Sequence, residues 1–176
     1  MVDYHLEVCD LLLYICSLKE PTSKHQFENM KQPIDRTKTL NVLILDDNNE
    51  VLQITRQIME CILDGADRVW NMYSTVSPQE ALDFICSENM DLVVTDWELP
   101  VIGGRTIVDT AKGKSKETRV IVYSGATDSK FDAIHESCPD AILAKPSTLD
   151  KIRLTVFDLL KLRPNQSVTA AQLITT

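Results

Sequence analysis

The sequence predicts an α/β fold in which a five-stranded parallel sheet is doubly wound, with helices covering both of its faces. From Leu40 onward, short runs rich in β-branched residues alternate with longer segments of helical periodicity. This alternation is typical of right-handed crossovers, which bury a parallel sheet between two helical layers. The strands are expected at Val42–Leu45, Val69–Thr75, Leu92–Thr95, Val120–Tyr123 and Ala141–Ala144.

The first two of five crossover helices are predicted from apolar spacing and from N-terminal signals. After the first strand, one apolar face is expected from residues three to four apart: Val51, Ile54 or Thr55, Ile58 and Ile62. In the second helix Ser77 fits the N-cap and Pro78 the first helical position. Glu80 completes a capping-box pattern with Ser77.

The remaining helices follow the third, fourth and fifth strands. One should begin near Gly104 and end near Lys112, and the next should end at Pro139. The last is expected to begin with Ser147 as its N-cap, because Asp150 follows three residues later. Together these elements predict one domain at residues 40–162.

Residues 1–39 lie outside this pattern, as does a short tail at residues 163–176. Apolar residues at intervals of four and three predict a short amphipathic helix: Val2, Leu6, Cys9, Leu13 and Cys16. Two heptads are too short for a stable coiled coil, so the helix needs a surface. Docking on its own domain and a homodimer are the two alternatives, beside a partly disordered leader. The polar stretch that follows, with two prolines, predicts a linker.

Composition narrows the function classes. The chain has 176 residues and a formal net charge of −8, of which −7 lies in residues 40–176. This charge argues against nucleic acid as a partner. Its five cysteines form no C-x-x-C pair, which favours reduced cytoplasmic thiols over a zinc site. No apolar run approaches the about 18 residues of a membrane span, so no membrane association is expected.

Polar residues stand where the predicted strands end. The first strand ends in Asp46 and Asp47, the third in Asp96, the fourth in Ser124 and the fifth in Lys145. In an open parallel sheet, ligands bind at the carboxyl ends of the strands. Three acids, a hydroxyl and an ammonium group are therefore expected to meet at one edge.

The chemistry of these groups is complementary. Two carboxylates about 4 Å apart near a surface repel each other by about 4 kcal/mol, so a cluster of them favours a bound cation. Mg²⁺ takes oxygen ligands while keeping several waters. The metal and Lys145 would together neutralise a phosphoryl group on Asp96, and phosphoryl transfer depends mostly on positioning and charge neutralisation.

Four motifs occur together in the order "LILDDN", "DLVVTDWELPVIGG", "VIVYSGA" and "LAKP". In this order and at these intervals the sequence resembles the receiver domain of two-component response regulators, which has a flavodoxin-like fold. The resemblance implies that Asp96 accepts a phosphoryl group. It also implies Mg²⁺ ligation by Asp47 directly, by Asp46 mainly through water, and by the backbone carbonyl of Glu98.

The same resemblance implies that Ser124 is the hydroxyl switch and that Lys145 binds phosphate. A cis peptide bond before Pro146 is also common in the family. Receivers commonly carry an aromatic residue three positions before the lysine, which swings inward with the hydroxyl residue. Here that position holds Ile142, and Tyr123, next to Ser124, is the candidate substitute.

The function implied is a phosphorylation-activated switch rather than an enzyme with turnover on an external substrate. A sensor histidine kinase or phosphotransfer protein would supply the phosphoryl group, and a downstream protein would receive the signal. The tail after the last helix is too short for a DNA-binding domain. This predicts a stand-alone receiver or one cut from a larger protein.

Three alternatives compete with this interpretation. A phosphorylation-independent interaction module is favoured by Ile142 and disfavoured by the intact acidic residues. A haloacid dehalogenase-type phosphatase also uses an aspartyl phosphate, but its acidic pair comes late in the chain rather than first. A flavin mononucleotide carrier would need hydroxyls and backbone N–H groups at its phosphate loop, not Asp46 and Asp47.

Overall fold

The computed structural model describes residues 37–125 and 128–165. The predicted N-terminal helix, nearly all of the linker that follows it and most of the C-terminal tail lie outside these residues. Among the helices that are described, none combines the length and the apolar character that a membrane span requires.

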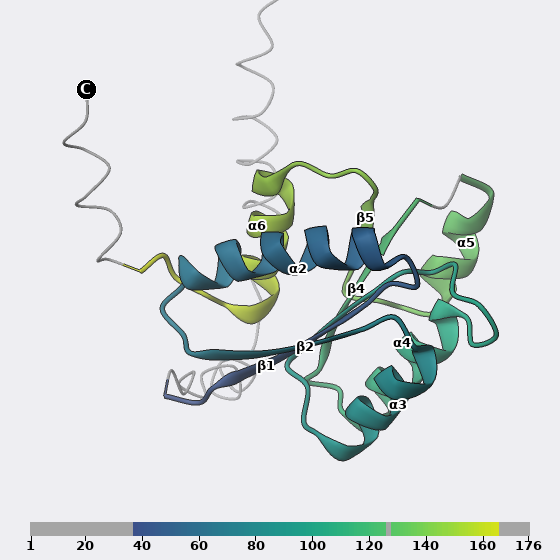
Figure 1. Ribbon diagram of the computed structural model, residues 1–176, viewed down its shortest axis with the longest axis horizontal. Coiled ribbons are helices and arrows are strands. Elements are labelled where there is room, and N and C mark those ends of the chain that lie inside the picture. The colour runs from purple at the N-terminus through teal and green to yellow at the C-terminus, as the bar shows by residue number, and fades with distance from the viewer. Residues whose placement is uncertain (1–36, 126–127, 166–176) are drawn as a thin grey trace, which may run out of the picture. The chain divides into compact units, whose positions relative to one another are not determined.

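Five parallel strands form one sheet, as predicted, and their order in the sheet is β2-β1-β3-β4-β5 (Figure 1). The strands are β1 (Leu40–Leu45), β2 (Trp70–Thr75), β3 (Leu92–Thr95), β4 (Arg119–Ser124) and β5 (Ala141–Ala144). The helices between and after them are α2 (Asn49–Asp64), α3 (Pro78–Ser87), α4 (Gly104–Lys114), α5 (Asp128–Glu136) and α6 (Leu149–Leu160).

The sheet separates two apolar cores. Helices α2 and α6 pack on one face, whereas α3, α4 and α5 pack on the other (Figure 1). Along β1, Val42 and Ile44 enter the first core, and Leu43 and Leu45 enter the second. Side chains of a strand alternate between the faces, so a strand buried on both sides must be apolar throughout. This requirement explains the continuous apolar run Val42–Leu45 within β1.

The predicted apolar face of α2 is partly wrong. Ile54 is 57% exposed, and the alternative, Thr55, is buried. The buried stripe consists of Leu52, Thr55, Met59, Ile62 and Leu63. Helix α2 begins after Asn48, whose side chain accepts hydrogen bonds from the backbone N–H of Glu50 and Val51. The buried face therefore lies about one residue further along the helix than predicted, with Leu52 and Met59 buried and Val51 and Ile58 only half-buried.

The start of α3 is confirmed, but its capping box is only half formed. Ser77 is the N-cap and accepts a hydrogen bond from the Glu80 backbone N–H. The Glu80 carboxylate accepts from the Thr75 hydroxyl instead of reaching back to Ser77. The Ser77 backbone N–H donates to the same hydroxyl group, at 3.0 Å. Thr75 thus connects the end of β2 to the first turn of α3.

The N-cap of α6 is Thr148, not Ser147 as predicted. The Thr148 hydroxyl accepts from the Lys151 backbone N–H. Ser147 is occupied otherwise, because its hydroxyl donates to the Ala144 carbonyl at 2.7 Å. This contact closes the turn between β5 and α6, so the helix begins one residue later.

A second charged cluster surrounds Asp140, just before β5. Its carboxylate accepts from the Arg119 guanidinium at 3.0 Å, from the Val120 backbone N–H at 2.7 Å and from the Lys112 ammonium. Burial raises the pKa of Asp140, but the hydrogen bonds outweigh burial and hold the pKa below its ordinary value of 3.8. The cluster therefore stabilises the folded state at neutral pH.

We expect Asp140→Asn to lower the free energy of unfolding by about 2 kcal/mol, because it removes charge-assisted hydrogen bonds from a carboxylate that is only 13% exposed. Denaturant unfolding at pH 7 measures this change. Asp109→Asn, which alters an exposed carboxylate on α4, is the matched control and should change stability by less than about 0.5 kcal/mol.

The pH dependence gives a second measurement of the same contact. Because the pKa of Asp140 is lowered in the folded state, its contacts stabilise the fold fully at pH values above the unfolded-state pKa of 3.8. This stabilisation is lost as the pH falls through the folded-state pKa. The difference in the free energy of unfolding between wild type and Asp140→Asn should therefore become smaller below about pH 4. A difference that stays constant down to full acid unfolding would contradict this assignment.

Candidate functional site

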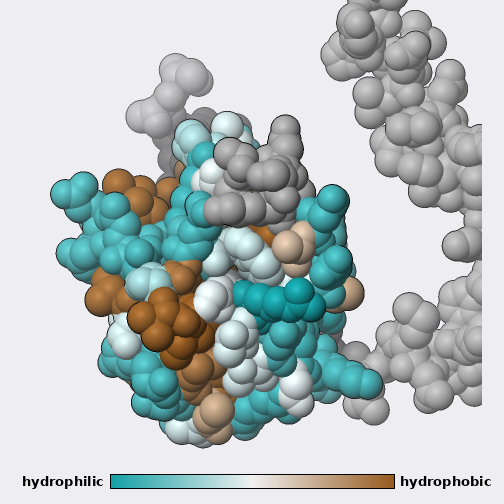
Figure 2. Space-filling model, turned by 90° about the vertical axis from the view of Figure 1, so that its right-hand side faces the viewer, coloured by the Kyte–Doolittle hydropathy of each residue, from teal (hydrophilic) through white to brown (hydrophobic). Residues whose placement is uncertain are grey.

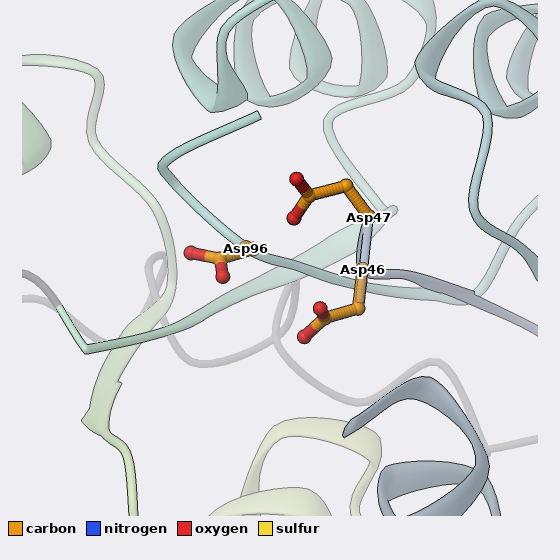
Figure 3. Close-up of side chains that lie close together, drawn as sticks. All are labelled: Asp46, Asp47 and Asp96. Carbon is orange, nitrogen blue, oxygen red and sulfur yellow. The ribbon is translucent and has the colours of Figure 1, made fainter. Parts of the chain in front are cut away.

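Three carboxylates meet at the carboxyl ends of β1 and β3, as predicted. Asp46 and Asp47 follow β1, and Asp96 follows β3, the strand paired with β1. One carboxylate oxygen of each residue lies within 4.8 Å of the others. Figure 3 shows the three carboxylates directed toward one common space at this edge. Asp46 is buried and Asp47 exposed, so the space opens to solvent on the Asp47 side.

Lys145 links the two more buried carboxylates. Its ammonium group lies 2.5 Å from Asp46 Oδ2 and 2.6 Å from Asp96 Oδ2. Burial lowers the pKa of Lys145, but hydrogen bonds and charge attraction from both carboxylates outweigh burial and raise this pKa above its ordinary value of 10.5. Lys145 therefore carries a positive charge throughout the physiological pH range.

Backbone N–H groups hold the other oxygens of these two carboxylates. Asp96 Oδ1 accepts from the N–H of Trp97 at 2.5 Å and from the N–H of Glu98 at 3.1 Å. Asp46 Oδ1 accepts from the N–H of Asn48 at 3.0 Å. Each side chain is thus fixed on one side by its own loop and on the other by Lys145, which gives the site a defined shape.

The remaining predicted residues lie at the same edge. Ser124 ends β4 and is buried, opposite Ala144 in the register of β4 and β5. Glu98 is exposed and lines an open hollow together with Asp47 and Trp97. The peptide bond between Lys145 and Pro146 is cis, as expected. The structure therefore brings all the predicted residues to one edge, while the role of each stays a prediction.

Comparison with known proteins identifies the family. Residues 42–157 match the model of the response regulator receiver domain. The chain belongs to this family. Receiver domains are modules of two-component signalling and phosphorelay rather than turnover enzymes, and they interact with histidine kinases or phosphotransfer proteins. This membership argues against the haloacid dehalogenase and flavin alternatives.

Two curated relatives are each 28% identical to this receiver domain over 127 residues. The match to the sensor histidine kinase TmoS of Ectopseudomonas mendocina covers 69% of this chain but only 12% of that protein. The match to sporulation initiation phosphotransferase F of Bacillus subtilis (strain 168) covers 70% of this chain and 96% of that protein.

A solved structure confirms the receiver fold. The receiver domain of a sensor histidine kinase from Pseudomonas aeruginosa PAO1 has a TM-score of 0.61 at 12% identity, and the match covers 70% of this chain and 99% of that one. That structure has a magnesium ion coordinated in its active-site cleft.

The donor atoms of this receiver domain fit a hard divalent cation. Three carboxylates and the Lys145 ammonium leave the cluster with a formal charge of −2, which a divalent cation would balance. Carboxylate oxygens are the ligands that Mg²⁺ prefers, and Mg²⁺ usually takes only one or two from the protein and keeps its waters. The open side at Asp47 leaves space for those waters.

Gly104 packs against the site, a role that the sequence motifs did not predict. A Cβ atom at Gly104 would lie 2.5 Å from the Asp96 carbonyl oxygen and 2.6 Å from the Trp97 Cα. The first turn of α4 therefore packs directly on the backbone that carries Asp96. The connecting loop is tight, since Val101 has a φ of 65°, which is rare for a β-branched residue. The pair of adjacent glycines, Gly103 and Gly104, is the feature of the sequence that could have indicated this close packing.

Gly104→Ala should therefore displace the Asp96 backbone and lower the free energy of unfolding by about 1–3 kcal/mol, as overpacking does. Gly113→Ala is a matched control on the same helix, because nothing lies within 4 Å of its added Cβ atom. The control should stabilise by up to about 1 kcal/mol, since alanine is the better helix former. Denaturant unfolding of both variants measures the contrast, and equal effects would contradict the close packing.

Proposed function

We propose that this receiver domain accepts a phosphoryl group on Asp96 and that Mg²⁺ assists the transfer. The observation that carries this proposal is the Lys145 ammonium placed between the carboxylates of Asp46 and Asp96. Asp46 and Asp47 would hold the metal together with Asp96 and the backbone carbonyl of Glu98. The metal would supply positive charge for the incoming phosphoryl oxygens.

Asp96 is the best placed of the three acids to act as the nucleophile. It directly follows the central strand β3, and two backbone N–H groups orient its carboxylate. An Asp96 oxygen attacks phosphorus, the bond from phosphorus to the donor breaks, and the donor leaves with the electron pair. The carboxylate becomes an acyl phosphate, so Lys145 exchanges its Asp96 contact for a phosphoryl oxygen. The Ser124 hydroxyl would donate to another phosphoryl oxygen.

The surroundings of the site fit a protein as phosphoryl donor. Figure 2 shows the side of the molecule where the strands end, with apolar side chains gathered beside hydrophilic ones. Val76 directly follows β2, and Val101 lies in the loop between Asp96 and α4. Both side chains are exposed, that of Val101 completely. Apolar side chains beside an acidic site offer contact area that a small phosphate donor does not need. We therefore propose a sensor histidine kinase or phosphotransfer protein as the donor.

The output we propose is contact with a downstream protein, with no nucleic acid partner, because the net charge is −8. We propose no turnover on an external substrate, since the phosphoryl group stays on the chain's own aspartate. Three exposed free thiols, at Cys61, Cys86 and Cys138, support a reducing cytoplasmic location. A homodimer through residues 1–39 is part of the same proposal.

One observation favours a second function, assembly that is independent of phosphorylation. Ile142 stands at the position where the family commonly has its mobile aromatic residue, and it packs against the core under α3 and α4. An aliphatic side chain held there has no bulky ring to move when Asp96 changes charge. The phosphorylation experiment separates the two functions.

Incubation with acetyl phosphate and Mg²⁺ should add the mass of one phosphoryl group to the intact chain. Asp96→Asn should abolish the gain because it removes the nucleophile, and a chelator should abolish it by removing the metal. Asp83→Asn, an exposed carboxylate change on α3, should leave the gain unchanged. A wild-type chain without any gain would favour the assembly function.

Glu98 should shorten the lifetime of the phosphoryl group. Its exposed carboxylate lines the hollow beside Asp47 and can accept a hydrogen bond from an attacking water. We expect Glu98→Ala and Glu98→Asn to slow dephosphorylation by about threefold to tenfold, less than a fully positioned general base would give. Loss of label from the purified phosphoprotein measures this rate. Glu88→Ala, a change at another exposed glutamate, is the control and should leave the dephosphorylation rate unchanged. Equal rates in wild type and both Glu98 variants would show that Glu98 does not assist dephosphorylation.

A further inference from the structure

Tyr123 differs from the aromatic residue that the family commonly carries near its lysine. It precedes Ser124 on β4, so the two side chains leave opposite faces of the sheet. Tyr123 packs against the core under α2 and α6, whereas Ile142 packs against the core under α3 and α4. Tyr123 therefore does not replace the missing aromatic residue at Ile142, and any action on the site must use another contact.

That contact is with Lys145. The Lys145 ammonium lies over the Tyr123 ring, 5.5 Å from the ring centroid. An ammonium group within about 6 Å of an aromatic face is attracted by the negative potential of the ring, and more strongly where water is excluded. The Lys145 side chain is only 18% exposed. The ring is thus a third partner of the ammonium group, beside Asp46 and Asp96.

The Tyr123 hydroxyl is the weaker part of this arrangement. It accepts from the Ser147 backbone N–H at 3.4 Å, which is long for a hydrogen bond. The turn around Ser147 is also closed by the shorter contact from the Ser147 hydroxyl to the Ala144 carbonyl. Removal of the Tyr123 hydroxyl should therefore change the position of Lys145 little, because the contact with the ammonium group is made by the ring.

We propose that Tyr123 is a positioning residue that holds the Lys145 ammonium at the mouth of the site. The proposal rests on the proposed function, in which Lys145 must move from a carboxylate oxygen to a phosphoryl oxygen. During that exchange Lys145 loses one charged partner, and its side chain has four rotatable bonds. The ring contact does not change with the charge of Asp96, so it keeps the ammonium near the reacting atoms.

The first test compares rate constants for phosphorylation by acetyl phosphate at saturating Mg²⁺. Tyr123→Leu removes the ring and should lower the rate constant about fivefold. Tyr123→Phe keeps the ring and should stay within about twofold of wild type. Tyr73→Leu is the matched control, because Tyr73 is a half-buried β2 tyrosine that contacts Phe84 instead of the site. Equal rate constants for wild type and Tyr123→Leu would overturn the proposal.

A second arm separates the ring's electrostatic effect from simple packing. Trifluorophenylalanine at position 123 has nearly the shape of phenylalanine but a much weaker negative potential on its face. Its rate constant should fall to that of Tyr123→Leu, whereas a rate equal to that of Tyr123→Phe would overturn the proposal. Denaturant unfolding checks that all variants are folded at the assay temperature.

A third arm needs no phosphoryl donor. In the NMR spectrum, the Lys145 side-chain methylene signals, assigned by their loss in Lys145→Arg, should show a ring-current shift that disappears in Tyr123→Leu. If the shift is present but wild type accepts no phosphoryl group, the proposed function fails and the positioning role fails with it. If wild type is phosphorylated and the shift is absent, only the positioning role fails.

Discussion

The charge imbalance at the carboxyl edge of the sheet is the constraint on which the site depends. Among the described residues, three carboxylates share this space with one ammonium group, that of Lys145. In the strand order, Lys145 follows the edge strand β5 and reaches past β4 to acids that follow β3 and β1. A long side chain such as that of lysine spans that distance. The sheet order and the length of the Lys145 side chain are thus parts of one electrostatic arrangement.

The Asp140 cluster shows what a purely structural charge cluster looks like in the same protein. There one carboxylate accepts from Lys112, Arg119 and a backbone N–H, so its charge is more than balanced by the chain itself. Among the described residues at the carboxyl edge of the sheet the balance is the opposite, because three carboxylates face the single positive charge of Lys145. A cluster that is short of positive charge is stable in water only with screening or a bound cation. This difference, rather than the number of acidic residues, separates a ligand site from a stabilising ion pair.

The sequence was sufficient for the features that depend on local pattern. The runs at Leu92–Thr95 and Ala141–Ala144 are strands with the predicted bounds, and the polar residues at strand ends meet because parallel strands end at one edge. Features that depend on one specific contact in the folded chain were missed. The face of α2 depends on how the helix rolls on the sheet, the α6 cap moved because Ser147 bonds Ala144, and the importance of Gly104 comes from its contact with the Asp96 loop.

The two neighbours Tyr123 and Ser124 give the site a connection to each face of the sheet. Ser124 belongs to the side covered by α3, α4 and α5, and Tyr123 to the side covered by α2 and α6. On the proposed function, phosphorylation of Asp96 would alter the partners of Lys145, whose ammonium contacts the Tyr123 ring. With Ile142 in place of an aromatic residue, the position three before Lys145 has no ring that could respond to this change. The aromatic contact of the Lys145 ammonium therefore lies on the α2 and α6 side of the sheet, with Tyr123.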